Sequence, residues 1–264
     1  MNRVLPISVC IISGAEAHRI GRALTSVAGW TSEILVLLNE EISDGTDKIA
    51  EKHGAKVFRE PWKGHIAQKN SAAAKATQPW LLGLDADEVV SPELRAEIER
   101  TLADTAAAEA FAAYSFPRLN FFYGRWIRHG DWYPDRCLRL WRRGQAEWGG
   151  VDPHDKLLVR GAQGQLRGDL LHYSMENFEH QIAKTIQYAN DFVGQSAAQG
   201  RRVSWLDLAF RPTWRFLRAY LFKLGFLDGW QGYSIAWMTA FYTFLRYAKV
   251  RAAQAEQAEP PRPS

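Results

Sequence analysis

The sequence predicts an α/β fold: a mostly parallel central sheet flanked by helices, followed by an amphipathic helical segment at the C-terminal end. Short apolar, β-branched runs alternate with stretches of helical periodicity through the first 110 residues. Strands and helices that alternate at this spacing are typical of βαβ units, whose strands run parallel. The chain has 264 residues, 47% of them hydrophobic, so it can bury a core of ordinary size.

Four strands are expected in the first part of the chain, and the apolar runs place them at residues 7–12, 33–38, 55–58 and 80–84. Helical spacing of apolar residues predicts helices over residues 16–28, 43–53 and 68–76. A fourth helix begins after Ser91, which can cap it, with Pro92 at its first position. The first apolar run is short and opens with a proline, which favours a buried strand over a cleaved secretory signal.

The character of the chain changes after residue 110. Residues 111–172 are rich in aromatics and arginines and indicate further strands and loops, whereas residues 178–198 have helical spacing. A Gly-Arg-Arg break at 200–202 precedes a basic, aromatic segment, and the Pro-rich tail 252–264 has the composition of a disordered end. The two cysteines form no disulfide framework and no CxxC motif, which suits a reducing compartment.

Positive charge is concentrated near the C-terminal end. The net charge is +4, but residues 201–251 alone hold nine Lys or Arg against two Asp. The longest uncharged stretch, 229–245, has 17 positions and is rather polar, which is short for a helix that crosses a bilayer. We expect a pair of amphipathic helices at a membrane interface, with Arg211, Arg215 and Arg218 toward lipid phosphates. The alternative is a helical cap packed on the rest of the protein, or a dimer interface.

Three acidic residues, Asp85, Asp87 and Glu88, follow the fourth strand. In parallel sheets ligands bind beyond the carboxyl ends of the strands, so the loops after the first two strands should meet there too. Mg²⁺ or Mn²⁺ often joins one or two carboxylates to substrate phosphates. The alternative is a solvated turn, because acidic residues are common on surfaces. Glu88 has the weakest claim of the three, and we expect it to face solvent or the helix that follows.

These motifs resemble, in order, those of the family 2 glycosyltransferases. The stretches that carry the likeness lie within residues 5–190: SVCIISGAEAHRIG, ILVLLNEEISDGTD, QKNSAAAKATQPWLLGLDADE, NFFYGRWIRHGDWYPDRCLRLWRRG, VDPHDKLLV and LLHYS. The likeness is greatest to bacterial enzymes that glycosylate the lipopolysaccharide core, a group typified by a β-1,4-glucosyltransferase. The resemblance implies the GT-A nucleotide-sugar-binding fold.

Four regions follow from this resemblance and from composition. They are a nucleotide-sugar-binding half at 1–110, an acceptor and catalytic half of the same domain at 111–200, a membrane-associating segment at 201–251 and a disordered tail at 252–264. The resemblance also implies roles for particular residues. Asp87 would bind the metal, with His172 near the metal or diphosphate, and Asp155 would be the base that deprotonates the acceptor hydroxyl. Five residues would contact the nucleotide: Glu16, Asn39, Asp44, Lys69 and Asp85.

Two stretches depart from the family pattern. The first loop reads Ser13-Gly14-Ala15-Glu16 where the family has Thr-x-Asn-Glu, and the second strand ends in Asn39 where the family has Asp. Asn can hydrogen-bond a base or a ribose, but it brings no charge. The base, commonly uracil in the family, is therefore left open.

Side chains that suit sugars or phosphates follow residue 130, and four of them are candidate acceptor-binding residues: Trp132, Tyr133, Arg136 and Arg139. The alternative is that the two rings are core aromatics and the arginines form a solvated face. Asp155 could instead only pair with Lys156 or Arg160, and His172 could be a structural histidine.

The expected function is inverting, metal-dependent transfer of a sugar from a UDP-hexose to a hydroxyl of a lipid-linked or lipopolysaccharide-core glycan. It would take place at the cytoplasmic face of the cell membrane, with Mg²⁺ or Mn²⁺ as cofactor and an anionic membrane surface as partner. No nucleic-acid-binding motif is recognised. Three other functions stay open: a haloacid-dehalogenase-like phosphohydrolase with Asp85 as nucleophile, a nucleotidyltransferase, and a non-catalytic membrane-binding module.

Overall fold

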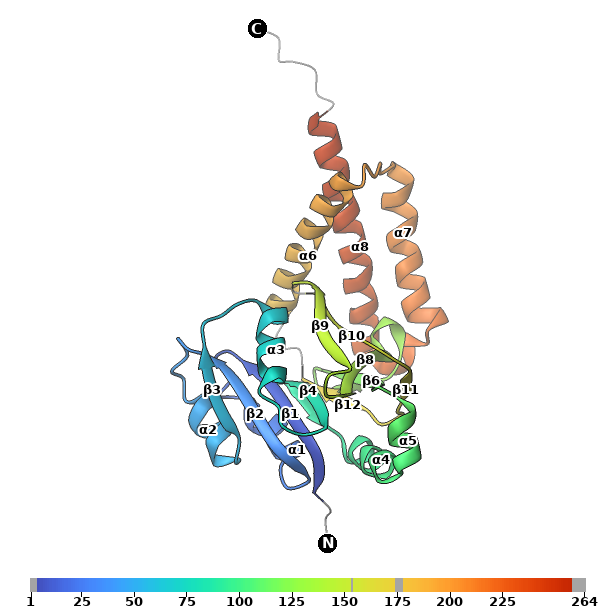
Figure 1. The fold of residues 1–264 in the computed structure, drawn as a ribbon. Coiled ribbons are helices and arrows are strands. Elements are labelled where there is room, and N and C mark those ends of the chain that lie inside the picture. Colours follow the sequence, from blue (N-terminus) through green and yellow to red (C-terminus); the bar gives the residue numbers. More distant parts are fainter. Residues whose placement is uncertain (1–3, 153, 174–177, 258–264) are drawn as a thin grey trace. The chain divides into compact units, whose positions relative to one another are not determined.

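The structure, a computed structural model, describes residues 4–152, 154–173 and 178–257. The chain divides into two compact units, whose elements are labelled in Figure 1. The first unit holds residues 1–119 and 135–174, and the second holds residues 120–134 and 175–264.

A curled sheet of strands forms the first unit, in the order β3-β2-β1-β4-β8-β6-β12-β5, with β11 also paired to β6. These strands are β1 (Leu5–Ser13), β2 (Thr31–Asn39), β3 (Lys56–Glu60), β4 (Trp80–Asp85), β5 (Glu88–Val90), β6 (Ala113–Phe122), β8 (Asp135–Arg142), β11 (Gln163–Gln165) and β12 (Leu170–His172). The strands from β3 to β4 run parallel, as predicted, whereas β8 and β6 continue the sheet antiparallel. A separate two-stranded sheet pairs β9 (Ala146–Val151) with β10 (His154–Val159).

The helices of the first unit connect these strands: α1 (Ile20–Val27), α2 (Thr46–Lys52), α3 (His65–Ala74), α4 (Pro92–Ala103) and α5 (Thr105–Ala110). Helix α4 starts as predicted, because Ser91 Oγ accepts a hydrogen bond from Leu94 N at 3.1 Å. Helix α1 begins four residues later than expected. Glu16 heads a turn instead, and its carbonyl accepts from the amides of Arg19 and Ile20.

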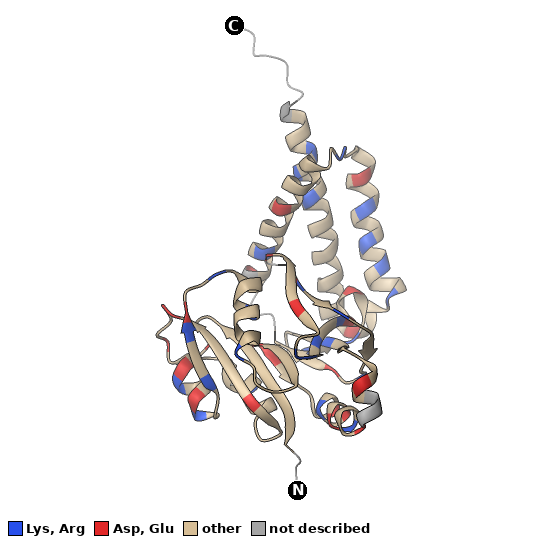
Figure 2. Ribbon diagram, viewed as in Figure 1, with Lys and Arg blue, Asp and Glu red and all other residues tan. Residues whose placement is uncertain are grey.

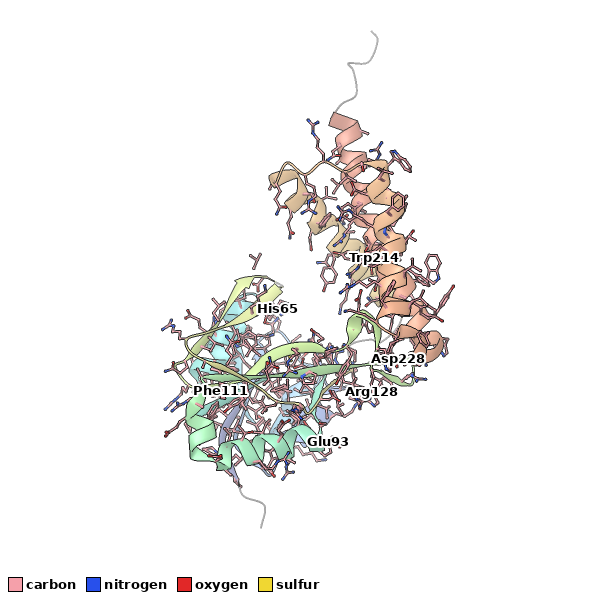
Figure 3. The ribbon with its side chains drawn as sticks, turned by 90° about the vertical axis from the view of Figure 1, so that its right-hand side faces the viewer. His65, Glu93, Phe111, Arg128, Trp214 and Asp228 are labelled. Atoms are coloured by element: carbon pink, nitrogen blue, oxygen red, sulfur yellow. The ribbon has the colours of Figure 1, made fainter. Side chains whose placement is uncertain are left out.

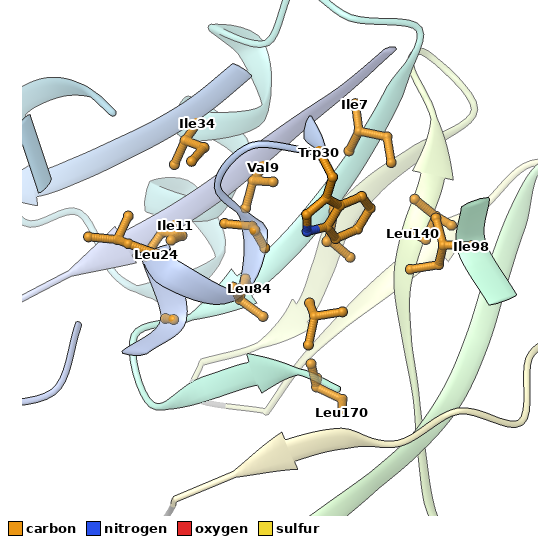
Figure 4. Packing of buried hydrophobic residues seen from close by; sticks show 14 of the residues in the cluster. Ile7, Val9, Ile11, Leu24, Trp30, Ile34, Leu84, Ile98, Leu140 and Leu170 are labelled. Atoms are coloured by element: carbon orange, nitrogen blue, oxygen red, sulfur yellow. The ribbon is translucent and has the colours of Figure 1, made fainter. Parts of the chain in front are cut away.

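Both faces of the central strands are buried, which explains their unbroken apolar runs. Because side chains alternate along a strand, Val9 and Ile11 of β1 pack into one cluster around Trp30, shown in Figure 4. Cys10 of the same strand faces a second cluster, which contains Trp141 and Trp148. Packing on both faces of the sheet therefore fixes the positions of the strand ends.

The second unit is mainly helical. Its elements are β7 (Arg125–Ile127), η1 (Gly130–Trp132), α6 (Phe178–Ala198), α7 (Trp205–Leu217), the π-helical turn η2 (Arg218–Phe222), η3 (Gly225–Asp228) and α8 (Gly229–Gln257). Helix α8 packs against both α6 and α7. Within the described part of the chain, no helix combines the length and apolarity needed to cross a bilayer.

Two features of sequence fix the ends of these helices. Ser204 and Asp207 form a capping box at the start of α7, in which each side chain accepts from the other residue's amide. Asp228 is buried before α8, and its carboxylate accepts from the amides of Arg128 and His129 at 3.0 and 2.7 Å. Figure 3 labels Arg128 and Asp228 side by side. The buried carboxylate ties the loop after β7 to the start of α8.

The basic residues of α7 and η2 are not arranged as expected. Figure 2 shows Lys and Arg along this segment. Arg211 pairs with Asp207, one turn earlier, whereas Arg215 and Arg218 lie within 3.3 and 3.2 Å of the Asp131 carboxylate. The prediction that all three point toward lipid phosphates is therefore wrong for Arg215 and Arg218, because a buried carboxylate from another segment attracts them more strongly than solvent.

Candidate active site

Polar loops meet at the carboxyl ends of the parallel strands, as predicted. Asp44, after β2, accepts from Ala17 N in the loop after β1 at 3.0 Å. Its other oxygen accepts from Thr46 Oγ1 at 2.6 Å, and that hydroxyl oxygen accepts from Glu16 N. The loop after β4 joins them, because the Arg19 guanidinium lies 3.7 Å from the Asp87 carboxylate. Three strand ends thus form one polar rim.

Asp85 ends β4 on the same face as Leu81 and Gly83 and lies between two cations. Its Oδ2 accepts from Arg139 Nη2 at 2.5 Å, and its Oδ1 is 3.3 Å from Lys69 Nζ. Burial acts to raise the pKa of Asp85, but the charges of Arg139 and Lys69 hold it well below its usual range. The two cations therefore favour the ionised form of this carboxyl.

Lys69 brings together two carboxylates that are distant in sequence. Its ammonium donates to Asp155 Oδ2 at 2.9 Å while it lies near Asp85. Helix α3 supplies Lys69, β4 supplies Asp85 and β10 supplies Asp155. The sequence predicted both carboxylates as site residues, and the structure places them on the same ammonium.

Glu88 is the clearest correction to the sequence-based expectation. It is fully buried rather than facing solvent. Its Oε2 accepts from Asp85 N at 3.0 Å, and its Oε1 lies 3.0 Å from Arg139 and 3.4 Å from Arg118. A buried carboxylate is tolerated only when it is paired and hydrogen-bonded. Glu88 therefore holds Arg139 and the Asp85 backbone in place.

Asp87 and His172 come together from two elements. His172 lies on β12, whose antiparallel pairing with β5 sets it opposite Glu88. Its Nε2 is 3.5 Å from Asp87 Oδ2. Burial acts to raise the pKa of Asp87, but the hydrogen bond and charge of His172 keep it below the usual value. A carboxylate beside an imidazole can supply two ligands to a divalent cation.

The remaining predicted nucleotide residues lie on the same rim. Asn39 ends β2, and its Oδ1 is buried with no hydrogen-bond partner among the described residues. An orphaned buried acceptor is uncommon in proteins and marks a position where a donor from a ligand can bind. Glu16 instead pairs with Arg19, three residues later. Hydrogen bonds hold the Asp44 pKa below its usual range despite the opposing effect of burial.

Trp148 on β9 forms the wall beside Lys69. Its ring lies 4.6 Å from Lys69 Nζ and 5.5 Å from the Arg139 guanidinium, both at cation–π distance. Gly83 lets this ring approach the sheet, because a Cβ there would lie only 2.9 Å from Trp148 Cζ2. Asn70 fixes the strand that carries the ring, since its side chain exchanges two hydrogen bonds with the Trp148 backbone.

The four candidate acceptor residues are divided between the two units, Arg136 and Arg139 in the first and Trp132 and Tyr133 in the second. Arg139 is buried and pairs with Asp85 and Glu88. It is therefore not part of a solvated face, and in this position it does not reach an acceptor bound at the surface. Arg136 is exposed and donates to the carbonyls of Ser115 and Leu166. The two rings belong to the second unit: Trp132 packs beside Phe122 and Ile127, and Tyr133 follows it.

Two partners of the predicted carboxylates Asp85 and Asp87 escaped sequence-based reasoning. Arg19 lies beside Asp87. Its position in the loop after the first strand, three residues after Glu16, could have indicated that it belongs to the site. The second is Arg139 in its observed role as the partner of Asp85. Nothing in the spacing of CLRLWRR distinguishes this arginine from its neighbours, because only the sheet order places β8 next to β4.

The motifs and the fold have counterparts among known proteins. A family model described as glycosyl transferase family 2 matches residues 8–163, which is more than half of the chain. The chain belongs to glycosyl transferase family 2. It is 32% identical to an uncharacterised glycosyltransferase of Rickettsia typhi over 93% of this chain and 86% of that protein. It is 28% identical to a lipopolysaccharide core biosynthesis glycosyltransferase of Rhizobium meliloti, over 97% of this chain and 96% of that protein.

The fold of this family 2 enzyme agrees with a solved structure. A mannosyltransferase of Pyrobaculum calidifontis, in complex with GDP-mannose and Mn²⁺, superposes with a TM-score of 0.50 and 15% identity, over 97% of this chain and 76% of that one. The predicted GT-A fold is confirmed. The family also decides against the phosphohydrolase alternative, in agreement with the geometry, since Lys69 and Arg139 hold the oxygens that Asp85 would need as a nucleophile.

Proposed function

We propose that this family 2 enzyme catalyses inverting transfer of a hexose from a nucleoside diphosphate sugar, a UDP-hexose, to a hydroxyl of a lipid-linked or lipopolysaccharide-core glycan. The observation that carries the proposal is the position of Lys69, between Asp85 and Asp155. Residues assigned to the donor and to the attacking hydroxyl thereby meet at one ammonium. The named relative from Rhizobium meliloti supports a lipopolysaccharide-core acceptor.

In this transfer the acceptor oxygen bonds to the anomeric carbon of the hexose. The bond from that carbon to the diphosphate oxygen breaks, and its electron pair leaves with the nucleoside diphosphate. Asp155 would take the proton of the attacking hydroxyl as general base. Lys69, beside it, would offset the negative charge of the departing diphosphate.

A divalent cation fits the chemistry of the site. Asp87 and His172 offer an oxygen and a nitrogen from adjacent elements, and their atoms already lie 3.5 Å apart. Mg²⁺ and Mn²⁺ are often held by one or two protein ligands and the substrate's phosphates, so a two-residue site is sufficient. The cation would supply electrostatic stabilisation of the leaving diphosphate. The Mn²⁺ bound by the Pyrobaculum enzyme supports this proposal.

The decisive experiment replaces Asp155. We expect Asp155→Asn to lower the transfer rate at least 10²-fold, because an amide cannot accept the hydroxyl proton. Asp152→Asn is the matched control, since Asp152 precedes β10, three residues before Asp155, and accepts a hydrogen bond from Ile66 N at 3.0 Å. Product formation is followed with a nucleotide-sugar donor and a lipopolysaccharide-core acceptor. An Asp155→Asn variant that folds and retains full transfer activity would refute the general-base role.

The donor is identified separately. UDP-, GDP-, ADP- and dTDP-hexoses are compared for Mn²⁺-dependent thermal stabilisation, because a ligand that binds the native state raises its melting temperature. We expect the UDP-hexose to give the largest shift. A larger shift with GDP-mannose, the ligand of the Pyrobaculum enzyme, would contradict the proposed UDP-hexose and indicate a GDP-sugar as the donor.

The second unit supplies a surface suited to the membrane. Helix α7 exposes Trp205, Phe210 and Trp214 by 64, 66 and 54%, and Trp214 is labelled in Figure 3. Large aromatic side chains on an amphipathic helix favour the interface between water and lipid. We therefore include in the proposal that the enzyme is peripheral on the cytoplasmic face of the membrane, where a lipid-linked acceptor is found.

A further inference from the structure

A pocket in the helical unit has features that glycosyl transfer at Asp155 does not use. It has a volume of about 230 Å³ and lies among η1, α6, α7 and α8. Pockets for drug-sized ligands start at roughly 300 Å³, so this slightly smaller pocket suits a ligand smaller than a drug, such as a single sugar unit. All the residues that line it belong to the second unit.

Positive charge gathers around Asp131, which lines this pocket together with Arg215. The Asp131 carboxylate is 9% exposed, and three cations lie within 3.3 Å of its oxygens: Arg215 at 3.3 Å, Arg218 at 3.2 Å and Lys223 at 2.9 Å. One carboxylate can balance only one of these charges. The cluster therefore carries two surplus positive charges where solvent is partly excluded, and an added anion would relieve their repulsion.

Hydrogen-bonding capacity at the cluster is also unused. Both Asp131 oxygens and Arg215 Nε are buried, yet none makes a hydrogen bond of good geometry with the described residues. The ion pairs give Asp131 its charge partners, but the hydrogen-bonding capacity of these three atoms stays unused. Buried polar atoms rarely stay without a partner in native proteins. A ligand with both an anionic group and hydroxyls would satisfy them.

The other residues that line the pocket are mainly aromatic and polar. Trp132, Tyr188 and Tyr242 line it, together with Gln181 and Thr239. Aromatic faces pack on the C–H faces of sugar rings, and amide or hydroxyl groups exchange hydrogen bonds with sugar hydroxyls. The Thr239 hydroxyl donates to Ile235 O, which leaves its oxygen free to accept. The wall suits a sugar ring better than a bare ion.

We propose that this pocket binds a phosphorylated sugar. Arg215 and its neighbouring cations would hold the phosphate, since guanidinium groups pair with phosphate oxygens in two parallel hydrogen bonds. Asp131 would accept from ring hydroxyls, and the aromatic wall would stack on the ring. Identification of this sugar as a unit of the acceptor glycan rests on the proposed function, whereas the binding itself does not.

The test measures binding without transfer. A hexose phosphate, the unphosphorylated hexose and inorganic phosphate are each titrated into the full-length protein, with ligand-observed NMR as readout. We expect the hexose phosphate to bind at least tenfold more tightly than either fragment. Arg215→Gln and Lys223→Gln should each weaken it at least fivefold. Arg211→Gln is the matched control, because Arg211 lies one turn earlier on α7 and pairs with Asp207.

Two further measurements keep the outcomes distinct. Thermal stabilisation by the donor sugar should be unchanged in all three variants, so that its loss would indicate misfolding rather than a lost pocket. Anionic phospholipid vesicles are compared in parallel. Equal binding of hexose phosphate and inorganic phosphate to the wild type would overturn the proposal. So would Arg215→Gln and Lys223→Gln variants that lose vesicle binding but keep hexose phosphate binding. If transfer fails in Asp155→Asn while hexose phosphate binding persists, the two proposals are separated.

Discussion

Single charged side chains decide the chemistry of this enzyme, and their partners decide their charge. Asp85, Asp87 and Glu88 are three carboxylates within four positions, yet each has a different environment. Asp85 faces Lys69 and Arg139, Asp87 faces His172, and Glu88 is sealed beneath them. All three side chains are carboxylates, so their roles differ because the tertiary structure gives each one different neighbours.

Asp87 is the residue on which metal dependence is expected to rest. Asp87→Asn keeps the shape but removes the charge that attracts a divalent cation. We expect the variant to lose Mn²⁺-dependent thermal stabilisation by the donor sugar and to lower transfer at least 10²-fold. Asp47→Asn is the control, because Asp47 is a carboxylate in the first turn of α2 that pairs with Arg59. An unchanged Mn²⁺ response in Asp87→Asn would remove Asp87 from the metal site.

Glu33 gives a pH prediction remote from the site. Burial acts to raise its pKa, but hydrogen bonds from Ser8, Lys56 and Thr77 lower it from 4.5 to about 2. The stabilisation is therefore complete above pH 4.5 and is lost as pH falls toward 2. Glu33→Gln should lower the free energy of unfolding by about 1–3 kcal/mol at pH 7.

The measurement compares urea denaturation of wild type and Glu33→Gln at several pH values. The difference in free energy between the two should shrink as pH falls from 5 to 3, because the Glu33 carboxyl of the unfolded chain binds a proton near pH 4.5 while that of the folded protein stays ionised until about pH 2. Glu51→Gln is an exposed control and should change the unfolding free energy by less than about 0.5 kcal/mol. A difference that stays constant with pH would show that the Glu33 charge is not the cause.

At the scale of elements, strand β4 positions the site and a glycine sets its shape. Gly83 lies where the rings of Trp141 and Trp148 cross the sheet, with centroids 5.9 Å apart. A Cβ at this position would lie 2.9 Å from Trp148 and 3.3 Å from Trp141. We expect Gly83→Ala to lower the free energy of unfolding by about 1–3 kcal/mol, because overpacking a filled core forces a shift.

Gly14→Ala is the matched control, since nothing lies within 4 Å of a Cβ there. Denaturation gives the free energies, and near-ultraviolet circular dichroism reports whether the tryptophan rings have moved. A Gly83→Ala variant as stable as Gly14→Ala, with an unchanged tryptophan signal, would contradict the packing described for β4.

Elements were largely predictable, and two exceptions are informative. The parallel strands and α4 follow from apolar periodicity and from Ser91 and Pro92, all of which are local signals. The late start of α1 depends on the turn headed by Glu16. The buried position of Glu88 depends on Arg118 and Arg139, which approach from β6 and β8. Neither non-local partner leaves a mark in the sequence around Glu88.

At the scale of the whole molecule, the two units provide separate functions in the proposal. The membrane surface of α7 should matter only when the acceptor is in a bilayer. Trp205→Ser combined with Phe210→Ser and Trp214→Ser should raise the KM for a vesicle-embedded acceptor at least fivefold. The same variant should leave the rate with detergent-solubilised acceptor unchanged, because the residues proposed for the transfer itself all belong to the first unit.

The control for this experiment is Trp62→Ser, which removes an exposed tryptophan from the first unit. Vesicle flotation measures binding directly, with neutral and anionic lipids compared. Equal flotation of the triple variant and wild type would remove α7 from the membrane surface. If Trp62→Ser lost as much vesicle binding as the triple variant, exposed aromatic side chains in general, rather than helix α7, would account for membrane binding.

The sequence by itself determined the family, the order of strands and helices and the candidate carboxylates, because periodicity and strand-end motifs are local properties of the chain. Asp85 and Asp87 could be chosen in this way, and Asp155 by its resemblance to a motif of the family. Only the tertiary structure decided which charges meet: Lys69 between Asp85 and Asp155, Glu88 beneath Arg139, and Arg215 and Arg218 on Asp131 rather than toward lipid. The physical reason is that a buried charge is stable only beside an opposite one, and that partner comes from segments far away along the chain.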